Sequence, residues 1–305
     1  MKRLLFGLLI VVGILFGLSA CGRHPSATYT KPLIVTTIHP YELILKELTD
    51  SLFTVENLLP TNASPHTWSP NPQDILKLQQ ADVIISNGLG LETNLEKALT
   101  QNKSLHLSAA SYLNEKDFIR DDDTLHNASE PSPEEHSGMV NPHIWTSPSL
   151  LIEIILGFSK DLSKQYPMLQ PQLESKARLM IMQINKTDGQ IQRELKEFEK
   201  PAVITLHDAF VYFFQYYGIE FVGSVLPAGG KDPSPRQLKE LADVIKAKHI
   251  KAILIEPRMN PKPAQTLASE LNLKILTYDD LGTATQAQDI AGFLWLNWLS
   301  IKAGL

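Results

Sequence analysis

Residues 33–60, LIVTTIHPYELILKELTDSLFTVENLLP, contain one complete succession of strand, helix and strand signals. The β-branched run at 33–38 predicts a buried strand, and residues 41–50 repeat leucine and isoleucine at helical spacing. TVENLLP at 54–60 predicts a second strand. Because a strand, a helix and a strand in this order favour parallel pairing, we expect a parallel sheet covered by helices.

The alternation of strand and helix signals continues on both sides of an acidic segment at about 115–140. Asn71 and Pro72 predict a helix start, because asparagine caps helices and proline suits their first position, and a third strand is expected at 83–88. Between about 115 and 140 the chain is acidic and nearly free of aliphatic residues, which predicts a mobile surface loop. Further strands, separated by helical segments, are predicted at 202–206, 221–226, 252–257 and 274–278.

A long helical segment separates the two sets of strands. Residues 166–200 contain no proline after Pro171 and end in the charged run RELKEFEK. At 1.5 Å per residue this segment can form a helix on the order of 45 Å long. We therefore predict an α/β protein with two doubly wound lobes, 32–165 and 201–305, joined by one long rigid helix, with the ligand cleft between the lobes.

The first 31 residues carry the signals of an exported protein. Two basic residues precede an apolar run, followed by Ser19, Ala20 and Cys21, the only cysteine in the chain. This order predicts a signal peptide over residues 1–20, since a membrane-spanning helix needs about 20 apolar residues. LSAC resembles a bacterial lipobox, in which the cysteine is lipid-modified; a plain signal peptide with an incidental cysteine is the alternative. Residues 21–31 would then be a polar tether.

The overall charge disfavours one class of partner. The chain of 305 residues has a formal net charge of -5, and no long basic run lies beyond its N-terminus. Nucleic-acid binding requires clustered lysine and arginine to neutralise phosphates, so nucleic acid is not an expected partner. A cationic ligand is compatible with this charge.

Four side chains with metal-binding chemistry occupy corresponding places in the two halves. His207 and Asp279 directly follow predicted strands, His66 lies in a proline-containing loop after another, and His143 precedes a helix. Ligands of doubly wound sheets bind beyond the carboxyl ends of the strands, so these residues are expected to meet between the lobes. Three imidazoles and one carboxylate suit a divalent transition metal. The alternative for each histidine alone is an ordinary turn or interface residue.

Four short motifs resemble those of the substrate-binding lipoproteins of bacterial zinc and manganese ABC importers. The motifs are SPHTW at 64–68, NPHIW at 141–145, TLHDAF at 205–210 and YDDLGT at 278–283. The resemblance extends over essentially the whole mature chain. It implies that His66, His143, His207 and Asp279 bind the metal, with Asp280 replacing Asp279 if the register shifts by one. It also implies an ABC permease and its ATPase as partners.

Several further residues are candidates for auxiliary roles. His39 also follows a strand, but the motifs of the family do not include it, so we interpret it as a residue that lines the cleft. His126 and His136 lie in the acidic loop and are candidates for recruiting zinc. Glu256 is expected either to orient a ligand or to pair with Arg258.

Three functions are compatible with these residues. The first is an exported, lipid-anchored, monomeric binding protein that faces the periplasm or the cell exterior and delivers a metal to a permease. The second is an exported zinc-dependent hydrolase, which would need a free acidic residue beside a metal-bound water; Asp279 is better used as the fourth ligand, so no enzyme activity is expected. The third is a surface adhesin stabilised by a metal, for which the sequence specifies no host ligand.

Zinc is the metal that the predicted ligands favour. Three nitrogens and one oxygen match zinc's preferred four-coordination, whereas manganese suits sites with more oxygen ligands and a higher coordination number. The histidines of the acidic loop favour zinc as well. Manganese is the alternative, because a carboxylate that binds through both oxygens would enlarge the coordination shell.

We predict that Cys21→Ala releases the protein from the membrane, because this substitution removes the atom that would carry the lipid. Membrane fractionation of cells that express the variant should find the protein in the soluble fraction. Unchanged membrane association would instead mean that residues 1–20 are retained as the anchor.

Overall fold

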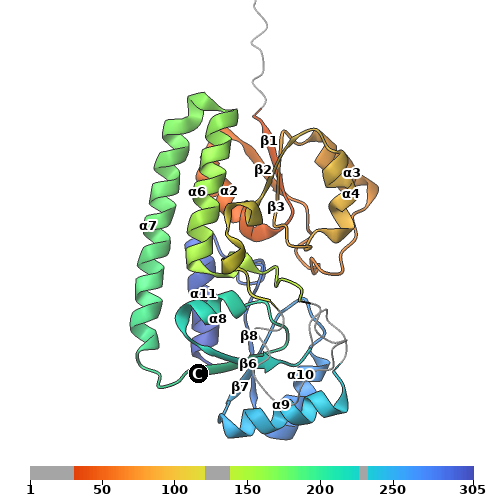
Figure 1. Cartoon of the computed structure of the whole chain (residues 1–305), viewed down its shortest axis with the longest axis vertical. Helices are drawn as coiled ribbons and strands as arrows, with labels where there is room; N and C mark the ends of the chain where they lie inside the picture. The colour runs from red at the N-terminus through yellow and green to blue at the C-terminus, as the bar shows by residue number, and fades with distance from the viewer. Residues whose placement is uncertain (1–30, 121–137, 227–232) are drawn as a thin grey trace, which may run out of the picture. The chain divides into compact units, whose positions relative to one another are not determined.

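Two parallel sheets of four strands each form the framework (Figure 1). The computed structural model describes residues 31–120, 138–226 and 233–305. The first sheet has the order β2-β1-β3-β4, with β1 (Leu33–Thr36), β2 (Thr54–Asn57), β3 (Val83–Ser86) and β4 (Leu105–Ser108). The second has the order β6-β5-β7-β8, with β5 (Ala202–Thr205), β6 (Glu220–Ser224), β7 (Ala252–Ile255) and β8 (Lys274–Thr277). The two halves therefore repeat one topology although their sequences show no repeat.

Central and edge strands differ in composition as their positions require. β1 and β3 lie in the middle of the first sheet, and β3 is buried along its whole length. β2, at the edge, has no fully buried residue, and Glu56 within it pairs with Lys77. A central parallel strand is covered on both faces, which is why the runs LIVT and VIIS are nearly free of charge.

The helices cover both faces of the sheets. In the first half they are α2 (His39–Thr49), α3 (Pro72–Gln80), α4 (Glu96–Gln101) and α6 (Pro148–Gln165). In the second half they are α8 (Val211–Tyr217), α9 (Pro235–Ala247), α10 (Lys262–Leu271) and α11 (Ile290–Lys302). Asn71 caps α3 by accepting hydrogen bonds from the backbone of Gln73 and Asp74, and Pro72 occupies the first turn, so the predicted helix start is confirmed.

The long helix between the halves is α7 (Gln170–Leu195). Its 26 residues correspond to about 39 Å at 1.5 Å per residue. The predicted segment 166–200 was too long at both ends, because Pro167–Leu169 form a separate 3-10 turn and the helix ends before the charged run is complete. The predicted strands also extended one to three residues too far at their carboxyl ends, where the chain already leaves the sheet.

Helix α7 packs against both halves of the protein. It contacts α2 and α6 of the first half and α11 of the second (Figure 1). Its buried face carries Leu173, Ala177, Met180, Ile184 and Ile191. These side chains belong to a single hydrophobic cluster that extends from β1 and α2 to α8 and α11. The helix that links the two sheets is thus part of one continuous core.

Each sheet also has a second, smaller core on its other face. One cluster joins Val35 and Ile84 to α3 and α4, and another joins Ile204 and Ile253 to α9 and α10. Helices on both faces of both sheets confirm the predicted doubly wound architecture. Within the described ranges, no helix has both the length and the apolar composition needed to span a membrane.

Several hydrogen bonds connect the halves near the carboxyl ends of the strands. Trp145 Nε1 donates to the Asp280 carbonyl at 2.7 Å, and the Tyr212 hydroxyl donates to the Asn141 carbonyl at 2.7 Å. The Thr283 hydroxyl donates to the Thr61 carbonyl at 3.3 Å. Together with α7, these bonds restrict any opening of the region between the sheets.

We predict that metal binding changes the overall dimensions of the protein very little. No pair of flexible strands crosses between the halves in the described chain, and α7 is packed over both, so the structure offers no hinge. Small-angle scattering curves of the metal-free and metal-bound protein should nearly coincide. A large compaction on binding would show that α7 is not a rigid linker.

Candidate metal site

Three histidines from different parts of the chain meet between the two sheets. One ring nitrogen from each of His66, His143 and His207 lies within 4.8 Å of the other two. The Nε2 atoms of His66 and His143 are 3.1 Å apart, and the ring centroids of the three residues are separated by 4.8 to 5.1 Å. His66 and His207 reach this place from loops that follow β2 and β5, and His143 reaches it from the turn before Ile144–Thr146, so the three side chains converge as the sequence predicted.

His66 is held by a loop that is fixed at both ends. The backbone N–H groups of Thr67 and Trp68 donate to the Ser64 carbonyl at 3.2 and 3.0 Å, which closes a turn around His66. The Trp68 ring packs against the core, and its carbonyl accepts a hydrogen bond from Asn94 at 2.8 Å. The stiffness of this loop therefore positions the imidazole: the residue as a whole is exposed, but its ring faces the rings of His143 and His207.

Asn141 sets the orientation and tautomer of His143. The Asn141 Oδ1 atom accepts from the backbone N–H of His143 at 3.0 Å and lies 2.8 Å from its Nδ1 atom. Because an amide oxygen can only accept, Nδ1 carries the hydrogen and Nε2 is left with a free lone pair. His143 is buried, so this lone pair faces the other two histidines.

Glu256 performs the corresponding function for His207. Glu256 Oε1 lies 3.2 Å from His207 Nδ1 and accepts a hydrogen bond from the Tyr278 hydroxyl at 2.5 Å. A carboxylate on the far side of an imidazole orients the ring and increases its basicity, as is common at metal-binding histidines. Of the two roles expected for Glu256, the structure shows the contact with the histidine; Arg258 forms its ion pairs with Asp279 and Asp280.

The three imidazoles have different protonation tendencies. Desolvation and the charge of His207 lower the pKa of His66, and burial with the charges of both neighbours lowers that of His143. Burial alone would lower the pKa of His207 too, but Glu256, aided by Asp208 and Asp280, raises it to about 9. Near neutral pH the imidazoles of His66 and His143 are therefore neutral, whereas His207 has to lose a proton before it can bind a metal ion.

Asp279 does not join this group, which differs from the expectation that it completes the ligand set. Among the described residues, the group consists of the histidines alone. The Asp279 side chain is fully buried; one carboxylate oxygen faces Arg258, and the other accepts from the backbone of Ala284 and Thr285 at 2.6 and 3.0 Å. Burial raises the pKa of Asp279, but Arg258 and these N–H groups more than offset that effect and lower it. Asp279 stabilises a loop in this structure.

Asp280, the alternative in the sequence, is less constrained. Its Oδ1 accepts from Arg258 Nη2 at 2.5 Å, while its Oδ2 accepts no hydrogen bond from any residue in the described ranges. Its backbone carbonyl receives the Trp145 indole N–H, and the Trp145 ring lies 5.1 Å from that of His143.

Of the auxiliary histidines, His39 is the one that the structure describes, and it lies outside the histidine group. His39 Nδ1 is 2.6 Å from Glu42 Oε2, and Lys46 pairs with the other oxygen of Glu42. His39 lines a groove of about 690 Å³ together with Thr283 and other residues of both halves, outside the histidine group. The ends of the acidic loop meet in a bridge between Arg120 and Val140, whereas His126 and His136 lie outside the described residues.

Three polar residues around the site were not predicted from the sequence. Asn141 and Arg258 hold neighbouring groups as described above, and Asp208 Oδ1 lies 3.3 Å from His207 Nε2. Asn141 Nδ2 donates to Asp208 Oδ2 at 2.9 Å, which connects the loops of His143 and His207. The positions of Asn141 and Asp208 beside the histidines in NPH and HDAF were the available signals, whereas Arg258 was considered only as a partner of Glu256.

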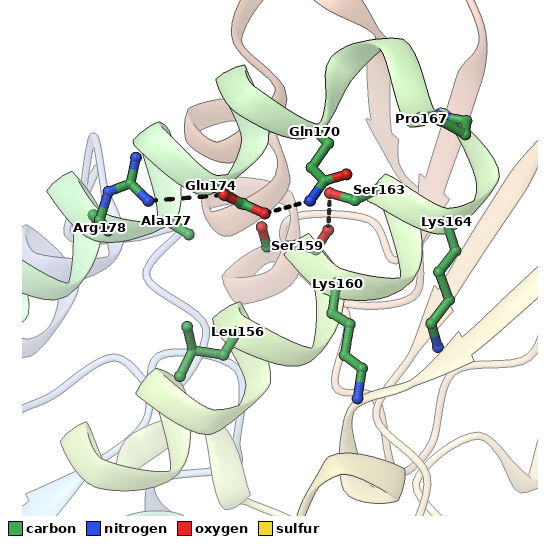
Figure 2. Close-up of a pocket in the computed structure, with 10 residues that line it drawn as sticks. All are labelled: Leu156, Ser159, Lys160, Ser163, Lys164, Pro167, Gln170, Glu174, Ala177 and Arg178. Carbon is green, nitrogen blue, oxygen red and sulfur yellow. Dashed lines mark hydrogen bonds and ion pairs between the residues drawn. The ribbon is translucent and has the colours of Figure 1, made fainter.

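A separate pocket of about 650 Å³ lies between α6 and α7 (Figure 2). Figure 2 shows Glu174 between Gln170 and Arg178 on α7, and the side chains of Lys160 and Lys164 on α6. None of the residues that line this pocket is a histidine or belongs to the group described above. The pocket therefore has no part in the metal site.

Two parallel sheets joined by a long packed helix, with three converging histidines between them, define a metal-binding receptor of the solute-binding class. The profile of the family described as "Zinc-uptake complex component A periplasmic" matches residues 34–303. The chain belongs to this family of extracytoplasmic components of zinc and manganese ABC uptake systems. Because these are transport components, the prediction that the chain is not an enzyme is confirmed.

Individual relatives match most of the chain. The high-affinity zinc uptake system protein ZnuA of Bacillus subtilis is 27% identical over 292 residues, which cover 93% of this chain and 91% of the relative. A putative metal-binding protein of Thermotoga maritima is 30% identical over 290 residues, covering 92% and 91%.

Solved structures share the fold. The periplasmic zinc-binding protein TroA from Treponema pallidum superposes with a TM-score of 0.77 at 22% identity, covering 90% of this chain and 99% of that one. A manganese-bound periplasmic metal-binding protein from Candidatus Liberibacter asiaticus gives 0.75 at 21%, covering 90% and 100%.

We predict that alanine at His66, His143 or His207 removes most of the thermal stabilisation by zinc. A ligand at about 100 times its Kd stabilises the folded state by about 2.7 kcal/mol, which for a chain near this size is a shift of roughly 5 to 10 °C. Each substitution should abolish most of that shift while leaving the metal-free melting temperature nearly unchanged. A residue whose alanine variant keeps the whole shift is not a ligand.

The matched control is His249→Asn. His249 is exposed on the surface and has a left-handed backbone with φ 55°, which asparagine tolerates. This variant should keep the full zinc-induced shift.

Proposed function

We propose that this protein captures zinc outside the cytoplasmic membrane through His66, His143 and His207 and delivers it to the permease of an ABC importer. The observation that carries the proposal is the convergence of the three imidazoles on one point. Asn141 and Glu256 face Nδ1 of His143 and of His207, so that Nε2 is the nitrogen through which each ring would bind a metal. A site built in this way needs little rearrangement to bind its ion.

The donor set supports zinc over manganese. Three imidazole nitrogens are ligands that zinc binds well in tetrahedral sites, and a fourth position can be filled by water or by a carboxylate. Manganese requires more oxygen ligands, and Asp279, the carboxylate expected from the sequence, is engaged in its own loop. The names of the relatives from Bacillus subtilis and Treponema pallidum refer to zinc, whereas the Liberibacter structure holds manganese. Manganese remains the second candidate.

The lipid anchor is part of the same proposal. Cys21 lies outside the described residues, and the support for its modification is the LSAC sequence after an apolar run. A tether of about ten residues reaches at most roughly 35 Å when fully extended. Such a tether would keep the receptor close to a permease in the same membrane.

Growth of a deletion strain under metal limitation tests the choice of metal. We expect the wild-type gene to restore growth when zinc is limiting and to have little effect when manganese is limiting. A gene that encodes His143→Ala with His207→Ala should fail under zinc limitation although the protein accumulates normally. Restoration under manganese limitation alone would overturn the assignment to zinc.

A further inference from the structure

We propose that Arg258 determines the metal specificity of the site by holding the carboxylate of Asp280 away from the histidines. This inference rests on the proposed function and concerns how that site distinguishes zinc from manganese. In the absence of the Arg258 contact, Asp280 would be able to supply oxygen ligands that favour manganese.

Arg258 is the centre of a buried ionic cluster beside the metal site. It follows β7 by three residues, and its side chain is only 5% exposed. Its Nη2 atom donates to both Asp279 Oδ1 and Asp280 Oδ1, and its Nη1 atom donates to the Thr283 hydroxyl at 2.7 Å. One guanidinium thus holds two carboxylates and one hydroxyl, which a lysine ammonium could not do with the same planar geometry.

The two carboxylates differ in how completely they are engaged. Asp279 accepts hydrogen bonds on both oxygens, including two from the backbone of its own loop, and is fully buried. Among the residues that the structure describes, Asp280 is bound through Oδ1 alone, and its side chain remains 9% exposed. Asp280 is therefore the carboxylate that can change partner without dismantling the loop.

The backbone of Asp280 is fixed next to the histidines. Its carbonyl accepts a hydrogen bond from Trp145, whose ring neighbours that of His143. A change in the side chain of Asp280 would thus bring its oxygens toward the ligand nitrogens without movement of either sheet.

The contact with Arg258 disfavours such a change. An arginine side chain does not deprotonate in proteins, so the ion pair persists at every physiological pH. Three imidazoles with one further donor are sufficient for four-coordinate zinc, but manganese gains from additional oxygen ligands. Withholding the Asp280 oxygens therefore weakens manganese binding much more than zinc binding.

The test is the ratio of the manganese and zinc dissociation constants, measured by competition with a fluorescent chelator. Arg258→Gln removes the charge and should tighten manganese binding about tenfold, the low end of effects seen for groups that support metal ligands. Zinc binding should change much less, so the ratio falls. A purely structural role of Arg258 would weaken the binding of both metals and would leave the ratio unchanged.

A second substitution identifies the carboxylate that is released. The manganese gain should disappear in Arg258→Gln with Asp280→Asn and persist in Arg258→Gln with Asp279→Asn. X-ray absorption of the manganese-loaded Arg258→Gln protein should show more oxygen ligands than that of wild type. A gain that survives the Asp280 substitution would overturn the proposal.

Two further variants guard against misfolding and against a general effect of charge. Thr283→Val removes the hydroxyl that accepts from Nη1 and that also donates to the Thr61 carbonyl at 3.3 Å. Because this hydroxyl lies near the surface, the variant should fold and lower the ratio to a smaller extent. Arg178→Gln, on the exposed side of α7, removes the same charge far from the site and should not alter the ratio. If Arg258→Gln does not fold, an unchanged ratio in Thr283→Val overturns the inference.

The binding measurements distinguish a failure of the proposed function from a failure of the role inferred for Arg258. If the wild-type protein binds neither metal, or if the histidine variants retain binding, the proposed function fails. If the wild-type protein binds zinc through the histidines but the ratio is insensitive to Arg258 and Thr283, only the role of Arg258 is refuted.

Discussion

Helix α7 sets the separation of the two sheets, and the metal site depends on that separation. His66 and His143 belong to the first half and His207 to the second, yet their ring nitrogens lie within 4.8 Å. A metal ion needs its ligand atoms within a few tenths of an ångström of their ideal positions. The continuous core around α7, together with the hydrogen bond from Trp298 to Glu194 at 2.8 Å, keeps the halves at a distance that allows this.

Within this frame, most of the charges lie behind the ligands, and Asp208, 3.3 Å from Nε2 of His207, is the one carboxylate on the ligand side among the described residues. Glu256 faces His207 from the side opposite the cluster, and Asp279 is neutralised by Arg258 and backbone N–H groups. The imidazoles of His66 and His143 are mainly neutral at physiological pH because desolvation lowers their pKa values. The arrangement keeps lone pairs available to a metal and limits competition by protons to the His207 and Glu256 pair.

Several features of the fold and the site followed from short-range patterns in the sequence. The run of strand and helix signals in residues 33–60 predicted a parallel sheet, and Asn71 and Pro72 predicted the start of α3. The histidines could be selected because they follow strand ends or lie in stiff loops, where parallel topology brings distant residues together. The short strand β4 was missed, since LHLS contains a histidine and a serine and is too short for a clear alternation.

The partners of the polar side chains were decided by the tertiary structure alone. The sequence indicated the three histidines, the two-sheet fold and the long helix. These features could be predicted because hydrophobic periodicity and the positions of prolines are local properties of the chain, visible within a few residues. It could not show that Asn141 would orient His143, or that Asp279 would bind its own loop and Arg258 instead of joining the histidines. A buried carboxylate must accept hydrogen bonds, and its donors are the groups that tertiary packing places beside it. Arg258 is 21 residues away from Asp279 along the chain and becomes its neighbour only because β7 pairs with β8.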